Sequence, residues 1–152
     1  MRKFFLTLGF SGLSPKAPGT VGSFVALILG YFALMVLSIE TFFLLTLLIS
    51  VVAVKQIDIY EKEVGVHDGK EIVIDELSGM WITLALAGLT TSSSIYLFLV
   101  AFIFFRAFDI LKPSIIGVID RKVQGGWGVM GDDMVAGVFA ALCTALVSYL
   151  FF

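Results

Sequence analysis

The chain ends with the stretch "GDDMVAGVFAALCTALVSYLFF" (Gly131–Phe152), an apolar run that opens with two adjacent acids. A membrane-spanning helix needs about 17–25 residues, and the run from Met134 onward reaches that length without a single charged residue. One acid at the start of a helix is explained by capping and by the helix dipole. The second acid has no such explanation, so Asp132 and Asp133 together predict a functional site.

The rest of the chain is equally apolar. Its 152 residues are 59% hydrophobic and 14% charged, with a mean hydropathy of +1.06, whereas a soluble domain is roughly 45–50% apolar and about 25% charged. Five apolar runs cover residues 20–38, 41–60, 75–91, 94–111 and 133–152. We therefore expect one all-α domain over residues 1–152, a small polytopic membrane helix bundle of four to five spans.

Nearly all charged residues lie on one side of the predicted membrane bundle. All ten Lys and Arg residues fall in segments 1–20, 55–76 and 106–133, which the five spans place on the same side. Glu40 is the only one of the twelve acidic residues on the other side. The positive-inside rule predicts that the charged side, with the N-terminus and the active site, faces the cytoplasm. Polar chemistry gathered at one membrane face favours an enzyme acting on a lipid headgroup.

Acids from three helix ends are predicted at the same depth. Asp75 and Glu76 start the third run, Asp109 ends the fourth, and Asp132 and Asp133 start the fifth. Carboxylates that converge repel one another unless a cation or protons intervene, and Mg²⁺ or Mn²⁺ suits oxygen ligands. A metal site and a metal-free network of carboxylates with Arg and Lys are both consistent with this pattern.

Rows of small residues predict which helix faces point inward, because small residues line helix contacts in membranes. Asp133 is followed at helical spacing by Gly137, Ala140 and Thr144. Glu76 is followed by Gly79, Thr83 and Ala87. Asp133 and Glu76 are thus expected to face the bundle interior, where ionisable groups are functional candidates.

Three further segments are candidates for binding phosphate. In "SPKAPGTVGS" (Ser14–Ser23), Lys16 adds charge while Gly19 and Thr20 open a helix, whose free N–H groups favour an anion. Thr20 or Ser23 is expected to cap that helix, although a plain turn is the alternative. Arg106 and Lys112 at the end of the fourth run can bind phosphate oxygens, or Arg106 only neutralises Asp109. The glycine-rich segment 120–133 is predicted to be a loop that closes over a headgroup.

Residue counts exclude several phosphatase chemistries. The Cys-x5-Arg pattern fails, since Tyr149 stands where the arginine would follow Cys143. The single histidine, His67, excludes mechanisms that need two histidines and is itself compatible with a surface or a ligand role. An Asp-x-Asp nucleophile is excluded at Asp109, because Leu111 stands two places later. Hydrolysis assisted by a metal and carboxylates is left.

Four motifs together resemble the phosphatidylglycerophosphatase A family: "SGLSPKAPGTVGS", "HDGKEIVIDELSGMWI", "FRAFDILKPSIIGVIDR" and "GGWGVMGDDMVAG". They occur in the order of that family and cover most of the chain outside the spans. The resemblance implies Mg²⁺-dependent hydrolysis of phosphatidylglycerophosphate to phosphatidylglycerol and phosphate, a step of phospholipid biosynthesis, in a bacterial cytoplasmic (inner) membrane.

The resemblance also implies site residues. The acidic centre consists of Asp75, Glu76, Asp109, Asp132 and Asp133. We expect Asp75, Asp109, Asp132 and Asp133 to bind Mg²⁺, and Glu76, with Asp133, to take part in catalysis, Glu76 as the general base that activates water. Lys16, Gly19, Thr20, Arg106 and Lys112 are expected to bind the phosphate, the last two also stabilising charge during the reaction. A phospho-aspartate intermediate is the alternative to direct attack by water.

Two other classes of function stay open at this stage. One is a small membrane transporter of a cation or a phosphate ester, and the other is a non-enzymatic membrane partner with a one-sided acidic site. No nucleic-acid partner is expected for a chain of net charge −2. The partner is the phospholipid substrate, and the sequence leaves open whether the protein forms a homodimer.

Overall fold

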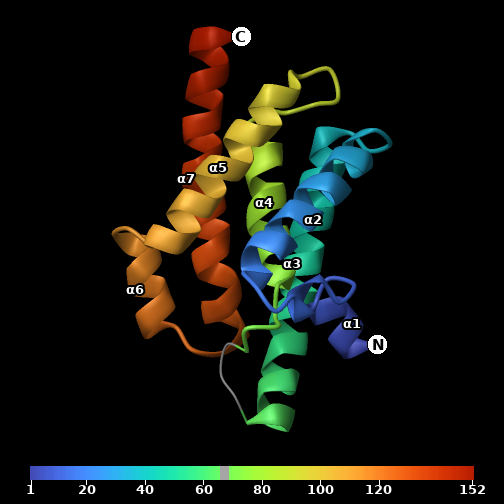
Figure 1. Cartoon of the computed structure of the whole chain (residues 1–152), viewed down its shortest axis with the longest axis vertical. Coiled ribbons are helices and arrows are strands. Elements are labelled where there is room, and N and C mark those ends of the chain that lie inside the picture. Colours follow the sequence, from blue (N-terminus) through green and yellow to red (C-terminus); the bar gives the residue numbers. More distant parts are fainter. Residues whose placement is uncertain (66–68) are drawn as a thin grey trace.

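The computed structural model describes residues 1–65 and 69–152, so His67 lies outside the described part (Figure 1). Within those ranges all regular structure is helical, which confirms the predicted class. The helices are α1 (Arg2–Leu6), a 3₁₀ turn η1 (Ser11–Leu13), α2 (Pro18–Leu34), α3 (Ile39–Val64), α4 (Ile74–Leu86), α5 (Ile95–Leu111), α6 (Ile115–Lys122) and α7 (Gly125–Phe151).

The core of the bundle is α4, the shortest of the five apolar helices. Eleven of its 13 residues are buried, and it packs against α2, α3, α5 and α7. Phe42 of α3 stacks on Trp81 of α4 with ring centroids 4.7 Å apart, and the Trp81 indole N–H donates to the carbonyl of Ala26 in α2 at 2.8 Å. A helix buried on every side is apolar all round, which explains why α4 resembled a membrane span in the sequence.

The inward faces predicted from small residues are confirmed. Gly137 of α7 lies directly on the backbone of Gly79 in α4, so close that a Cβ on either residue would overlap the partner helix. Thr83 also bridges the two helices, because its hydroxyl donates to the carbonyls of Gly79 (2.9 Å) and Gly137 (3.2 Å). Gly22 of α2 packs in the same manner on Val73, which precedes α4.

The outer surface carries large apolar side chains. Leu44 and Leu48 of α3, Ile103 of α5 and Leu142 of α7 are each more than 60% exposed. Exposed apolar surface of this extent indicates contact with lipid. In the part of the chain that the structure describes, two helices, α3 with 26 residues and α7 with 27, are long and apolar enough to cross a membrane, and α2 is a shorter apolar helix. The sequence prediction of four to five spans is not confirmed by this criterion.

One prediction about local structure is wrong. The glycine-rich segment 120–133 is not a loop, since α7 begins at Gly125 and α6 covers Ile115–Lys122. Its glycines instead permit close packing: a Cβ on Gly126 would overlap the carbonyl of Val54, and one on Gly128 would overlap the carbonyl of Val123.

α7 begins at Gly125, earlier than predicted, because a residue distant in sequence caps it. Asp58 of α3 accepts a hydrogen bond from the backbone N–H of Gly126 at 2.7 Å, which satisfies one of the free donors at the helix start. Asp132 and Asp133 consequently lie about two turns inside α7, and the prediction that they open the helix is wrong.

Candidate active site

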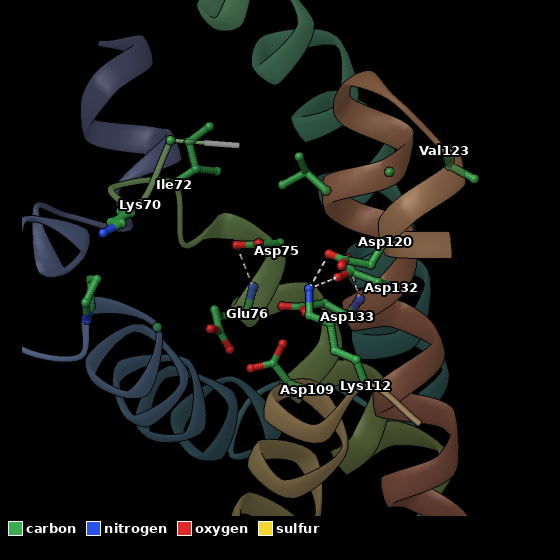
Figure 2. A pocket seen from close by; sticks show the side chains of 15 residues that line it. Lys70, Ile72, Asp75, Glu76, Asp109, Lys112, Asp120, Val123, Asp132 and Asp133 are labelled. Atoms are coloured by element: carbon green, nitrogen blue, oxygen red, sulfur yellow. Dashed lines mark hydrogen bonds and ion pairs between the residues drawn. The ribbon is translucent and has the colours of Figure 1, made fainter. Parts of the chain in front are cut away.

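A cavity of about 340 Å³ lies where the start of α4, the start of α2, the end of α5 and the first turns of α7 meet (Figure 2). The predicted convergence of acids from three helices is therefore observed. The cavity is lined by six acidic residues: Asp75, Glu76, Asp109, Asp120, Asp132 and Asp133. Gly19, Lys70 and Lys112 also line it.

Three of the acids form a tight group. One carboxylate oxygen from each of Glu76, Asp109 and Asp133 lies within 4.8 Å of the other two, a spacing at which they could share a metal ion. Glu76 and Asp133 are buried, and Asp109 is partly buried. Asp75 and Asp132, the other predicted metal ligands, line the same cavity but are not members of this group.

Arg106 holds two members of the group. Its Nη1 lies 2.7 Å from both oxygens of Glu76 and 2.6 Å from Oδ2 of Asp109. Only 14% of the Arg106 side chain is exposed, so these charges interact with little screening by solvent. The Arg106–Asp109 pair predicted from sequence is observed. Arg106 pairs with two carboxylates and not with Asp109 alone, while phosphate binding by Arg106 stays a prediction.

Ser23 belongs to the site, although it was not predicted from the sequence as a site residue. It was predicted as a possible helix cap, but α2 begins at Pro18, and neither Thr20 nor Ser23 caps it. The Ser23 hydroxyl donates to Oε2 of Glu76 at 2.5 Å and receives a hydrogen bond from Arg106 Nη1 at 3.1 Å. A Cβ on neighbouring Gly19 would overlap Oε1 of Glu76. The start of α2 thus packs directly on the Glu76 carboxylate.

Lys112 forms a second charge cluster at the rim. Its side chain pairs with Asp120 and, at 2.6 Å, with Asp132. Burial lowers the pKa of the Lys112 ammonium group, but hydrogen bonds to Asp120 and Asp132 outweigh burial, so that the pKa lies above its usual value. As predicted from Pro113, the helix ends just before Lys112, which adopts a left-handed conformation with φ 43° and ψ 52°.

Three predicted phosphate-binding residues, Lys16, Thr20 and Arg106, are not among the described residues that line the cavity. Lys16 is exposed in the segment before α2. Conversely, Lys70 and Asp120 line it without having been predicted as site residues. The pairing of Asp120 with Lys112, eight residues earlier, depends on the turn at Pro113 and on α6, which the sequence analysis did not predict.

The donor set fits a divalent cation. Oδ2 of Asp133 is buried and has no hydrogen-bond partner among the described residues, and an unpaired buried carboxylate oxygen is costly. Three carboxylates against one guanidinium leave two negative charges in the group if all are ionised. Hard oxygen ligands of this kind are those that Mg²⁺ and Mn²⁺ prefer.

Comparison with known proteins gives a consistent picture. Residues 4–148 match the family model described as phosphatidylglycerophosphatase A. The chain is 39% identical over 145 residues to the phosphatidylglycerophosphatase A of Haemophilus influenzae, covering 95% of this chain and 87% of that protein. It is 42% identical over 137 residues to the protein of that name from Escherichia coli, covering 90% of this chain and 77% of the relative.

A third relative has a different name. A protein from Bacteroides thetaiotaomicron, provisionally named a phosphatidylinositol-3-phosphatase, is 37% identical over 146 residues, which cover 91% of this chain and 88% of that protein. All three names describe removal of a phosphate from a lipid headgroup, but the headgroup differs. No solved structure matches the chain.

Proposed function

Because the chain belongs to the phosphatidylglycerophosphatase A family, we propose that it hydrolyses phosphatidylglycerophosphate to phosphatidylglycerol and inorganic phosphate. The observation that carries this proposal, beside the family, is the group of Glu76, Asp109 and Asp133 that lines the cavity, with Arg106 paired to the first two. The apolar outer surface provides the membrane contact that a phospholipid substrate requires.

The charge of the cavity supports a role for Mg²⁺. Six carboxylates line it, against the two lysines Lys70 and Lys112, so a phosphate monoester would meet net repulsion without an added cation. We propose that Glu76, Asp109 and Asp133 hold Mg²⁺. When bound, the ion supplies Lewis-acid stabilisation of charge on the phosphoryl oxygens and activates water.

The remaining polar groups have proposed roles that follow from their contacts. Arg106 keeps Glu76 and Asp109 in place and offsets part of their repulsion. Both oxygens of Glu76 accept hydrogen bonds from Arg106, which disfavours a general base. An oxygen of Glu76 lies within 4.8 Å of one from each of Asp109 and Asp133, so we assign Glu76 to binding the cation. The Lys112 ammonium group has three donors, of which Asp120 and Asp132 take two. The third donor has no hydrogen-bond partner among the described residues, and we assign it to a phosphoryl oxygen.

We further propose that the cavity faces the cytoplasm of a bacterial cell. The support is the distribution of charge: all ten Lys and Arg residues lie in the three segments on the side of the site. In α3 the exposed residues Glu40 and Lys62 mark opposite ends of one membrane-length helix.

The function is tested with the purified protein in lipid vesicles. Phosphate release is measured with Mg²⁺ from phosphatidylglycerophosphate, from phosphatidylinositol 3-phosphate and from phosphatidic acid. We expect phosphatidylglycerophosphate to be hydrolysed fastest. Preference for phosphatidylinositol 3-phosphate would reassign the headgroup, and no release from any of the three lipids would contradict a phosphatase and favour the transporter or the structural partner.

A further inference from the structure

An apolar groove runs along the outer seam between α2 and α5, with a volume of about 260 Å³. Only aliphatic and aromatic side chains line it, among them Phe24, Ile28 and Phe32 of α2 and Ile95 and Leu99 of α5. Ile28 and Leu99 are 41% and 47% exposed, so the groove is open to the outside of the bundle.

The groove lies on the same two helices that contribute Ser23 and Arg106 to the site. Phe24 lines the groove, whereas its neighbour Ser23 binds Glu76 and Arg106. On α5 the ring of Phe102 contacts Phe24, with centroids 6.2 Å apart, one turn before Arg106. Neighbouring parts of the same two helices therefore carry the groove and the side chains that bind Glu76.

The dimensions match one membrane leaflet. From Arg106 to Ile95, α5 rises about 16 Å at 1.5 Å per residue. Half of the roughly 30 Å hydrocarbon core is about 15 Å. A lipid whose terminal phosphate lies in the cavity would thus have an acyl chain at the depth of the groove.

From this arrangement we infer that the α2–α5 groove binds an acyl chain of the lipid substrate and orients the headgroup toward the carboxylates. The inference rests on the proposed function and adds the path by which substrate reaches the site. Since lipid tails are as apolar as the groove, occupancy adds little affinity and acts by positioning, and small misplacements of a reacting group are costly to the rate.

The test compares substrates with long and short acyl chains, and substitutions in the groove with a substitution on the outer face of α3. In Leu99→Trp and Ile28→Trp the indole is placed in the groove. The matched control is Leu48→Trp on the outer face of α3, where the Leu48 side chain is 61% exposed. For phosphatidylglycerophosphate with bilayer-length chains, we expect kcat/KM to fall roughly tenfold in the groove variants and to stay unchanged in the control. A substrate with chains too short to reach the groove should be hydrolysed equally by all four proteins.

Two results would overturn the inference: equal losses in the groove variants and in Leu48→Trp, or equal losses on long and short chains in folded groove variants. Both results leave the proposed function intact, whereas an inactive wild-type protein contradicts that function instead.

A second measurement needs no variant. A photoreactive group placed midway along the acyl chain of phosphatidylglycerophosphate should crosslink wild-type protein at α2 and α5. Crosslinks spread over the exposed faces of α3 and α7 would overturn the groove whether or not the protein is active.

Discussion

Gly137 of α7 lies on the carbonyl oxygen of Gly79 in α4 with no room for a Cβ between them. This crossing sets the geometry of the active site, because Asp133 and Glu76 each lie about one turn before the glycine of their own helix. Helices that approach closely at the two glycines bring the two buried carboxylates into one group.

Replacing Gly137 by valine should therefore damage both stability and activity. The added side chain would force α7 away from α4, and overpacking of this kind typically costs about 1–3 kcal/mol. We expect a lower midpoint of thermal unfolding in detergent and loss of phosphate release. Val138→Ala, at the neighbouring exposed position, is the control and should change neither. A Gly137→Val protein with wild-type unfolding and activity would show that the crossing is not tight.

Arg106 should not be replaceable by lysine. Lysine conserves the charge, but its shorter side chain does not bring a nitrogen to the position of Nη1, the atom through which Arg106 contacts both Glu76 and Asp109. We expect Arg106→Lys to fold and to lose most of kcat. Arg106→Gln leaves buried carboxylates unpaired, which costs about 3–5 kcal/mol, and should unfold at distinctly lower temperature. Full activity in Arg106→Lys would contradict a shared role for the guanidinium.

Asp58 should matter for stability rather than chemistry. Its carboxylate caps α7 through Gly126 and is not part of the described cavity lining. Loss of a helix cap costs about 0.5–2 kcal/mol, so we expect Asp58→Ala to unfold earlier while the folded fraction retains its KM for lipid. A large change in KM with unaltered unfolding would instead place Asp58 in substrate binding.

The proposed orientation can be tested on α3 alone. In a Cys143→Ser background, which removes the single native cysteine, we would introduce Glu40→Cys or Lys62→Cys at opposite ends of the helix. A membrane-impermeant maleimide added to bacterial cells with a permeable outer envelope should label the cysteine at 40 directly. The cysteine at 62 should react only after the cytoplasmic membrane is opened. The reverse pattern would put the active site outside the cytoplasm.

Much of the site was predictable because it depends on local spacing. Small residues at helical intervals after Glu76 and Asp133 identified the buried faces, and the i, i+3 spacing of Arg106 and Asp109 identified their ion pair. Both signals lie within single helices, where the 3.6-residue period relates sequence directly to position.

The errors concern features that depend on distant contacts. Glycine lowers helix propensity by about 1 kcal/mol, so the glycine-rich segment 120–133 was predicted to be a loop. The cap from Asp58 and the close packing on Val54, both some seventy residues earlier in the chain, favour a helix there. Likewise, no local pattern links Ser23 to Glu76, which lie 53 residues apart. Such pairings become visible only once the bundle is assembled.

The central claim is that Glu76, Asp109 and Asp133 form a divalent-cation site on which hydrolysis depends. The most direct measurement is phosphate release from phosphatidylglycerophosphate against Mg²⁺ concentration, for wild-type protein, Asp133→Asn and, as a control at the exposed start of α3, Glu40→Gln. We predict that EDTA abolishes release by the wild type, and that Asp133→Asn stays inactive at all Mg²⁺ concentrations while it unfolds at or above the wild-type temperature. Glu40→Gln should retain Mg²⁺-dependent release. Release that persists in EDTA and in Asp133→Asn would contradict the claim.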